Sequence, residues 1–246
     1  MNRRSVFIIV LLIVTIAISS HFLIKEISTN KKEMQVFNKI QEIVQVEEKI
    51  NEDNSVQENY DLKNLININQ DIIGWIKVDG TNIDYPVMQN KEFYLYKNIY
   101  KEYSSHGTPF LADYCDLNHS DNLIIYGHHM NDNTMFSQLE KYKNYNFYKN
   151  NKYIKFYTLN EEKTKEEIYE IAIVFKTVAY SNKTFKYYNY NNFVDENEFN
   201  QFIEKCNNLK LYNTDSKIIY GDKLITLSTC EYSQKNGRLV VIAKKI

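Results

Sequence analysis

The 246-residue sequence is poor in the residues that interrupt regular structure, with only two prolines and six glycines. Together with 21 tyrosines, this composition excludes a collagen-like chain and argues against a disordered one. Cysteine is also scarce. Cys115, Cys206 and Cys230 cannot all pair with one another, so the chain is not a disulfide scaffold, and a monomer keeps at least one free thiol.

A strong net charge is missing too. The formal net charge is −1, so no global field favours nucleic acid as a partner. The sequence lacks the CxxC, HExxH and EF-hand spacings of metal sites. Its adjacent histidines, His128 and His129, follow a predicted strand and would point to opposite faces, so we expect no metal site there. The length allows one sizeable domain and an accessory segment.

Charged residues are absent from one long run near the N-terminus, Val6 to Ile24. About 20 apolar residues are what a helix needs to cross a bilayer, and Arg3 and Arg4 before it favour a cytoplasmic N-terminus. A cleaved signal peptide is the alternative, because Ala17-Ile18-Ser19 loosely resembles a cleavage site. The run extends past that site, which favours an uncleaved single-pass anchor. We therefore predict a cytoplasmic tip and transmembrane anchor over residues 1–25.

The following segment is polar with a helical spacing of apolar residues. Between Lys31 and Asn51 apolar residues recur at three- and four-residue steps, which predicts an amphipathic helix that packs on the next domain or acts as a stalk. A partner-binding helix is a less favoured alternative. Glu52 to Glu58 has the composition of a linker. We assign residues 26–59 to this helix and linker, and residues 60–246 to a folded domain.

Strand patterns dominate the folded domain. Its predicted strands are Gly74–Val78, Ile83–Met88, Thr108–Ala112, Asn122–Tyr126, Tyr153–Leu159, Ile168–Tyr180, Leu224–Thr229 and Leu239–Ala243. Its predicted helices are a short one at residues 62–68, Met135–Asn151 and Asp195–Leu209. Asp79-Gly80 suits a tight hairpin turn, and Pro86 marks an edge strand or the end of a strand. Helices are too few for a βαβ array, so we expect a mainly antiparallel barrel or sandwich.

The last two predicted strands bring together two chemically useful side chains. Cys230 follows the first strand, and Arg238 begins the second after the turn-forming Asn236-Gly237. A thiol and a fixed positive charge at one end of a strand pair are suited to chemistry on a carbonyl. The ordinary alternatives are a buried structural cysteine and a solvated arginine.

A third candidate lies in Tyr126-Gly127-His128-His129-Met130, where an apolar strand ends in a glycine and two histidines. The ordinary interpretation is a capped strand with locally hydrogen-bonded imidazoles. An imidazole placed beside a cysteine can instead exchange its proton, because the thiolate is the nucleophile. His21, His106 and His119 have no identifiable partner in the sequence and are set aside.

These motifs resemble the sortases, the membrane-anchored transpeptidases of Gram-positive bacteria. Thr226-Leu227-Ser228-Thr229-Cys230 with Arg238 is similar to the TLxTC…R signature of that family. The Tyr126–Met130 motif, followed by Asp132, Thr134, Met135 and Phe136, resembles the class B branch. Gly74–Ile76, Ile83–Val87 and the helix before the last strands also match. The resemblance covers about residues 69–244 and implies a closed sortase-type β-barrel with peripheral helices, mainly β.

The resemblance also implies roles for individual residues. Cys230 would be the nucleophile, His128 (the histidine directly after the glycine, and not His129) the general acid/base, and Arg238 the substrate-orienting cation. Three neighbours of the nucleophile would line the substrate groove: Ser228, Thr229 and Glu231. Cys115 and Cys206 match no family site and are expected to be packing residues. Neither a metal nor an organic cofactor is implied.

The implied activity is acyl transfer at the outer face of the cell membrane. A surface protein with a C-terminal sorting motif would be cleaved after threonine, held as a thioacyl enzyme, and passed to an amine of peptidoglycan or its lipid-linked precursor. Two alternatives remain open: a secreted cysteine hydrolase on the same barrel, and a non-catalytic, membrane-tethered binding domain in which Cys230 is structural.

Overall fold

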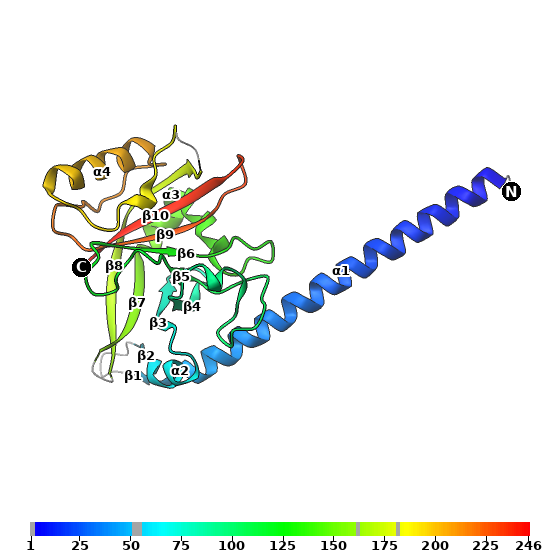
Figure 1. Cartoon of the computed structure of the whole chain (residues 1–246), viewed down its shortest axis with the longest axis horizontal. Coiled ribbons are helices and arrows are strands. Elements are labelled where there is room, and N and C mark those ends of the chain that lie inside the picture. Colours follow the sequence, from blue (N-terminus) through cyan, green and yellow to red (C-terminus); the bar gives the residue numbers. More distant parts are fainter. Residues whose placement is uncertain (1–2, 51–55, 161–162, 181–182) are drawn as a thin grey trace. The chain divides into compact units, whose positions relative to one another are not determined.

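The computed structural model describes residues 3–50, 56–160, 163–180 and 183–246, and the chain forms two compact units that meet between Ile40 and Gln41. Helix α1 (Arg3–Val44) forms the described part of the first unit, and its last four residues belong to the second (Figure 1). Its N-terminal part is long and apolar enough to cross a membrane, and the most apolar window has no buried residues. These properties fit the predicted membrane anchor.

The predicted amphipathic helix ends earlier than expected. Helix α1 continues without a break to Val44, and Gln45–Ile50 forms strand β1 instead of the last helical turns. Strand β1 pairs antiparallel with β2 (Val56–Tyr60), which begins inside the expected linker. The apolar spacing of residues 45–50 is compatible with a helix, but these residues form backbone hydrogen bonds with β2 instead. A local spacing does not reveal such a partner strand. Residues 51–55, which include the last residue of the expected helix and the first four of the expected linker, lie outside the described part of the chain.

The second unit contains a closed barrel of eight described strands, in the order β10-β8-β7-β3-β4-β5-β6-β9. The strands are β3 (Ile72–Val78), β4 (Asp84–Met88), β5 (Phe110–Leu111), β6 (Asn122–Tyr126), β7 (Tyr153–Asn160), β8 (Lys163–Val178), β9 (Leu224–Cys230) and β10 (Gly237–Lys245). Most neighbours are antiparallel, whereas β4–β5 and β6–β9 are parallel. The predicted barrel is confirmed, and the alternative of a sandwich is wrong.

Pro86 fits into this closed order without losing a ladder bond. It lies opposite Trp75 of β3, while on its other side β4 meets β5 only at Met88, which pairs with Phe110. Pro86 therefore precedes the short contact with β5. The missing N–H of proline costs nothing at such a position.

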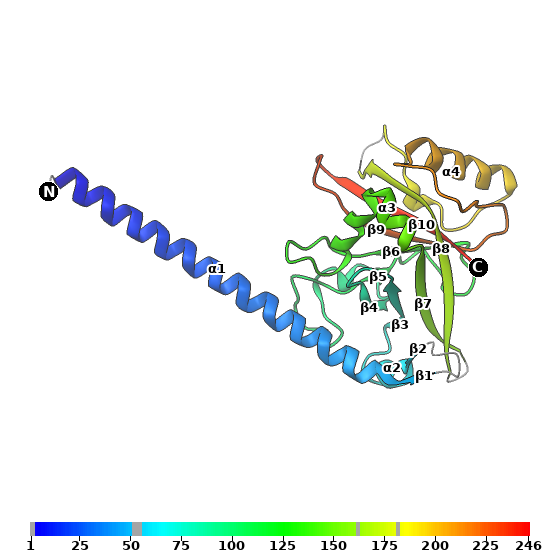
Figure 2. The same cartoon turned by 180° about the vertical axis from the view of Figure 1, so that it is seen from behind.

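Strands β9 and β10 run side by side in the second unit, as Figures 1 and 2 show from opposite sides. Every residue of β9 is buried except Cys230, which is half-buried at its end. Strand β9 lies between β6, to which it is parallel, and β10, to which it is antiparallel. The ends of these three strands form the part of the barrel in which the candidate side chains lie.

Helices cover the barrel from outside. They are α2 (Leu62–Ile68), the 3₁₀ helices η1 (Phe93–Tyr96), η2 (Phe136–Lys143) and η3 (Tyr187–Asn189), α3 (Tyr145–Asn150) and α4 (Glu196–Leu209). The predicted helix Met135–Asn151 is thus two shorter ones, because the Asn144 side chain accepts a hydrogen bond from Asn146 N and starts α3 anew.

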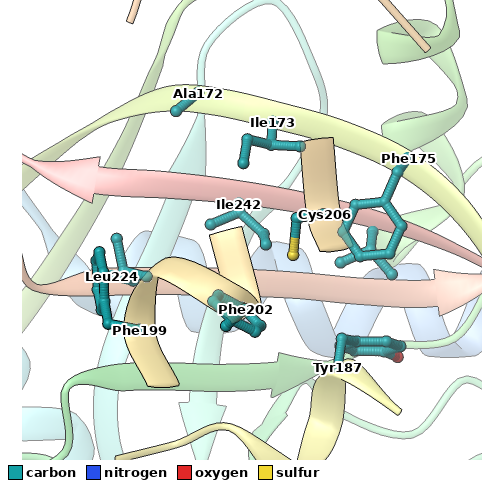
Figure 3. Close-up of a cluster of buried hydrophobic side chains, with 10 residues drawn as sticks. Ala172, Ile173, Phe175, Tyr187, Phe199, Phe202, Cys206, Leu224 and Ile242 are labelled. Carbon is teal, nitrogen blue, oxygen red and sulfur yellow. The ribbon is translucent and has the colours of Figure 1, made fainter. Parts of the chain in front are cut away.

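Helix α4 begins as predicted and buries an apolar face. Asp195 caps it by accepting a hydrogen bond from Glu198 N at 2.9 Å. Figure 3 shows Phe199, Phe202 and Cys206 of this helix facing side chains of β8, β9 and β10. The outer face of these strands is therefore covered, which contributes to the burial of β9 up to Thr229.

Candidate active site

Cys230 and Arg238 face each other across the β9–β10 pair. Their Cα atoms are register partners, and both residues are half-buried. Directly opposite residues of an antiparallel pair project to the same face of the sheet, with Cβ atoms about 5 Å apart. The turn at Asn236, where φ is +58°, returns the chain so that Gly237 begins β10. Local hairpin geometry alone therefore brings the thiol and the guanidinium together.

His128 reaches the same end of the barrel through the parallel pairing of β6 with β9. Tyr126 is the register partner of Ser228, and Gly127 N donates to the Ser228 carbonyl oxygen at 3.2 Å. His128 lies two residues beyond Tyr126, the last residue of β6, and Cys230 lies two residues after Ser228, at the end of β9. The Thr229 hydroxyl also donates to the Gly127 carbonyl oxygen at 2.8 Å. Parallel strands end at the same edge, so residues 102 positions apart along the chain emerge side by side.

The glycine before His128 is required by packing. A Cβ atom at Gly127 would lie 2.5 Å from Cγ of Phe136, well inside van der Waals contact. The Phe136 amide in turn donates to the His128 carbonyl oxygen at 2.8 Å. The backbone of His128 is therefore fixed by the ring and the amide of one residue.

The imidazole of His128 is held by a main-chain group. Its Nε2 atom lies 2.8 Å from the Leu95 carbonyl oxygen, and its ring centroid lies 5.6 Å from that of Tyr96. A carbonyl oxygen only accepts, so Nε2 carries the hydrogen and Nδ1 is the basic atom of the neutral ring. Burial lowers the pKa of His128 below 6.5, the Leu95 carbonyl raises it, and nearby His106 lowers it further. The neutral imidazole is thus favoured near pH 7.

All three side chains line one cleft of about 450 Å³. Its walls carry six aromatic residues: Phe110, Tyr114, Tyr126, Tyr180, Tyr187 and Tyr188. The guanidinium of Arg238 lies over the Tyr180 ring, with its central carbon 5.6 Å from the ring centroid, and Nη1 donates to the Gly237 carbonyl oxygen at 2.9 Å. These contacts hold the planar fork at the cleft. A thiol, an imidazole and a guanidinium in one apolar cleft can support acyl transfer.

Comparison with known proteins identifies the family of the chain that forms this cleft. A family model described as the sortase domain matches residues 76–246, which is most of the chain. Sortase B of Staphylococcus aureus (strain NCTC 8325 / PS 47) is 32% identical over 253 residues, covering 100% of this chain and 98% of that protein. The chain belongs to the sortase family.

Solved structures agree with this membership of the sortases and with its class B branch. Clostridium perfringens sortase B is 37% identical, with a TM-score of 0.67 over 75% of this chain and 98% of that one. Bacillus anthracis sortase B in complex with AAEK1 is 29% identical, with a TM-score of 0.71 over 89% and 99%. A Staphylococcus aureus sortase B–substrate complex is 35% identical, with a TM-score of 0.66 over 75% and 84%. Family membership supports a cysteine transpeptidase role for this sortase.

His129, the neighbouring histidine of the sortase motif, points elsewhere. It is not among the residues that line the cleft. Its Nδ1 donates to the Cys230 carbonyl oxygen at 2.9 Å, and its own carbonyl oxygen accepts from the Tyr232 hydroxyl at 3.0 Å. The two adjacent imidazoles therefore have different surroundings, as expected from the alternation of an extended chain. His129 supports the backbone of the cysteine.

The three residues predicted to line the substrate groove of the sortase separate into two kinds. Ser228 and Thr229 do line the cleft, although both are almost fully buried, and the Ser228 hydroxyl is hydrogen-bonded to Tyr187. Glu231 is only 3% exposed and is not a lining residue. Its carboxylate lies 2.6 Å from Lys143 Nζ and accepts hydrogen bonds from Ser233. The geometry gives Glu231 a role in holding the β9–β10 loop.

The remaining two thiols of the sortase are buried away from solvent, which makes them unreactive. Cys115 and Cys206 are buried, and neither forms a disulfide. Burial raises the pKa of Cys115 to about 11 and also raises that of Cys206. Both therefore behave as small packing residues. Within the described residues, no group of three or more His, Cys, Asp or Glu side chains is arranged to hold a metal ion.

Sequence reasoning missed the groups that surround the imidazole. The Leu95 carbonyl and the Tyr96 ring come from η1, more than 30 residues before His128, and a backbone acceptor has no sequence signal. His106 was set aside for want of a partner, yet it is 1% exposed and lies 2.7 Å from Asp132. The Asp132 residue of the class B motif was the one available signal.

Proposed function

We propose that this sortase is a membrane-anchored cysteine transpeptidase that cleaves the C-terminal sorting motif of surface proteins after threonine and joins them to a peptidoglycan amine. The single observation that carries the proposal is that Cys230, His128 and Arg238 line one cleft. The solved substrate complex of Staphylococcus aureus sortase B, a homologue, supports a substrate-binding role for such a cleft. Family membership supports the covalent route through a thiol.

The first half-reaction forms the thioacyl enzyme. Cys230 gives its proton to Nδ1 of His128 as the sulfur attacks the threonine carbonyl carbon, and the carbonyl oxygen becomes an oxyanion beside the Arg238 guanidinium. The intermediate collapses as the C–N bond breaks, and His128 passes the proton to the leaving amine. The neutral state of His128 near pH 7, favoured by burial, suits the initial proton acceptance.

The second half-reaction resolves the thioester. An amine of peptidoglycan or its lipid-linked precursor attacks the same carbonyl, and His128 accepts a proton from the attacking nitrogen. Collapse forms the new amide bond, breaks the C–S bond and returns the proton to the thiol. The two half-reactions together conserve all atoms and protons without a metal or an organic cofactor. Arg238 acts in both halves, because the oxyanion forms twice on the same carbon.

The anchor supports a location for this chemistry. Arg3 and Arg4 precede the apolar part of α1, and positive residues favour the cytoplasmic side. That orientation gives a single-pass protein with the catalytic domain outside the cell, where both surface proteins and peptidoglycan are accessible. We assign residues 1–25 to the tip and anchor, 26–59 to the connecting segment, and 60–246 to the catalytic domain.

The test is mass spectrometry of the enzyme and its products over a panel of sorting-motif peptides, with and without triglycine as the amine acceptor. We expect an adduct on Cys230 equal to the peptide fragment ending in threonine, and an amide product only when triglycine is present. Hydrolysis at the same rate with saturating triglycine would identify a hydrolase instead. Cys230→Ala is the control, and it should give neither adduct nor product. A wild-type enzyme without any adduct over the panel would contradict the proposal.

A further inference from the structure

His106 is a fully buried titratable side chain that the mechanism above does not use. Its Nε2 donates to Oδ2 of Asp132 at 2.7 Å, and its Nδ1 lies 3.2 Å from the Ser105 hydroxyl. The other oxygen of Asp132 accepts hydrogen bonds from the amide and the hydroxyl of Thr134. Burial raises the pKa of Asp132, but His106 and Thr134 together lower it below 3.8. Asp132 is therefore ionised, and both oxygens are occupied.

The loop that carries His106 is hydrogen-bonded to η1, the segment whose Leu95 carbonyl oxygen accepts from the imidazole of His128. Ser104 N donates to the Tyr96 carbonyl oxygen, and Thr108 N donates to the Tyr94 carbonyl oxygen, each at 3.0 Å. Between them, Gly107 has φ +60°, and a Cβ atom there would lie 2.5 Å from the Leu95 carbonyl oxygen. Residues 104–108 therefore wrap around the peptide group that accepts from His128.

Asp132 belongs to the segment on the other side of the imidazole. It lies in the turn that follows His128, and this turn closes where Phe136 N donates to the His128 carbonyl oxygen. A β-bridge between His129 and Met135 closes the turn a second time. The Asp132 carboxylate projects from this turn to His106, on a loop 26 residues earlier in the chain.

We propose that His106 and Asp132 are positioning residues for acyl transfer: their contact ties residues 104–108 to the turn after His128 and so holds the Leu95 carbonyl oxygen against Nε2 of His128. Neither residue is among those that line the cleft. The pair acts through the orientation of one ring, because the direction of Nδ1 follows from the hydrogen bond made by Nε2. This inference rests on the proposed role of His128 as acid/base.

A second consequence concerns charge. Asp132 is an ionised carboxylate in the turn that follows His128, and the His106 imidazole supplies the hydrogen bond to its Oδ2 atom. Burial and then the charge of Asp132 raise the pKa of Tyr85, whose hydroxyl accepts a hydrogen bond from Met135 N at 3.3 Å. His106 therefore keeps the carboxylate engaged away from the imidazole, which leaves a backbone carbonyl as the acceptor for His128.

The test compares His106→Gln and Asp132→Asn with His128→Gln as the reference. The first readout is the rate of Cys230 alkylation by iodoacetamide as a function of pH, which reports the coupling of the thiol to its imidazole and needs no substrate. The second is the kcat and KM of the peptide that the wild type cleaves fastest in the panel above. Thr226→Val is the matched control, because it removes a buried hydrogen bond to Asn122 away from the imidazole.

We expect the alkylation profiles of both variants to move toward that of His128→Gln. We expect kcat to fall about 10- to 100-fold with KM within twofold, as for a misplaced catalytic group. Thr226→Val should keep the wild-type profile despite a comparable loss of thermal stability. If His106→Gln does not fold, Asp132→Asn carries the test, since its amide retains an oxygen for Thr134. Wild-type profiles and kcat in the folded variants would overturn the inference.

The outcomes separate this inference from the proposed function. A shift in His128→Gln without one in His106→Gln and Asp132→Asn would refute only the positioning role. An unchanged profile and unchanged kcat in His128→Gln itself would refute the acid/base role of His128, and the positioning role with it.

Discussion

Arg238 lies directly opposite Cys230 in the β9–β10 pair, and its guanidinium is held over the ring of Tyr180. Adjacent cross-strand partners stay in register as long as the hairpin is intact, so the distance between the cation and the sulfur depends on local structure only. This arrangement suits the role proposed for Arg238 beside the developing oxyanion.

Arg238→Lys should lower kcat/KM by about 100-fold or more, because an ammonium cannot reproduce the guanidinium fork or its stacking on Tyr180. Steady-state kinetics on a cleaved sorting peptide measure the effect. The melting temperature and the iodoacetamide reactivity of Cys230 should remain near the wild-type values. A lysine variant with near-normal kcat/KM would show that charge alone is sufficient.

Substitution of the two adjacent histidines should give unequal losses. His128→Ala should lower kcat by about 100- to 10,000-fold, as for a lost general acid/base. His129→Ala should cost much less, because His129 is hydrogen-bonded to the main chain of Cys230, packs beside the Tyr232 ring and lies outside the cleft lining. Both variants are assayed at equal folded concentration. Equal losses would mean that the acid/base assignment is unsafe.

Thiol labelling of the native protein should modify Cys230 first. Cys115 and Cys206 are buried, and burial raises the pKa of both thiols, whereas Cys230 is half-buried at the cleft. Intact-mass measurement after brief iodoacetamide treatment at pH 7 should show one adduct, and three after denaturation. Cys230→Ala should show none before denaturation. Native labelling of Cys230→Ala would contradict the packing role of the other two thiols.

Glu231→Gln should destabilise the protein in a pH-dependent manner. Burial raises the pKa of Glu231, but Lys143 and Ser233 lower it more, to about 2, below the ordinary 4.5. A depressed carboxyl pKa contributes stability above pH 4.5 that is lost as pH falls toward 2. Urea unfolding at pH 7 should show a loss of about 2 kcal/mol, as for a hydrogen bond to a charged group.

The difference between Glu231→Gln and the wild type should shrink as pH falls from 4.5 toward 2, because the wild-type carboxyl then becomes protonated. Kinetics at pH 7 decide between the two roles considered for this residue. A raised KM with unchanged stability would restore Glu231 to the substrate groove, whereas reduced stability with an unchanged KM supports its role in the loop.

Gly127→Ala should disturb both stability and catalysis, because the added Cβ would overlap the Phe136 ring next to His128. We expect a loss of about 1–3 kcal/mol, as for overpacking, together with a fall in kcat. Gly221→Ala is the control: it has φ +96° but no atom within 4 Å of its Cβ, so it carries only backbone strain. Gly221→Ala should leave kcat unchanged. Normal activity in Gly127→Ala would show that the Phe136 contact is not needed.

Much of the barrel was predictable from local patterns. Asn122–Tyr126 was predicted with the bounds that β6 has, and the strands on either side of Asn236-Gly237 were predicted to within two residues. Short apolar runs bounded by turn residues give a strong signal for such strands. The predicted helix end at Asn51 was wrong by several residues, since α1 ends at Val44. The pairing of β1 with β2 depends on a second segment of the chain, which a local helical spacing does not reveal.

The identities of the cysteine, the arginine and the histidine came from the sequence, which also determined that the first two would meet, since a hairpin is a local structure. Only the tertiary structure decided that His128 joins them, that His129 is turned away and that Glu231 is engaged by Lys143. The physical reason is the large separation of these partners along the chain. Parallel pairing of β6 with β9 and the reach of the Leu95 carbonyl depend on closing long loops, and no spacing along the chain reports which distant backbone will arrive.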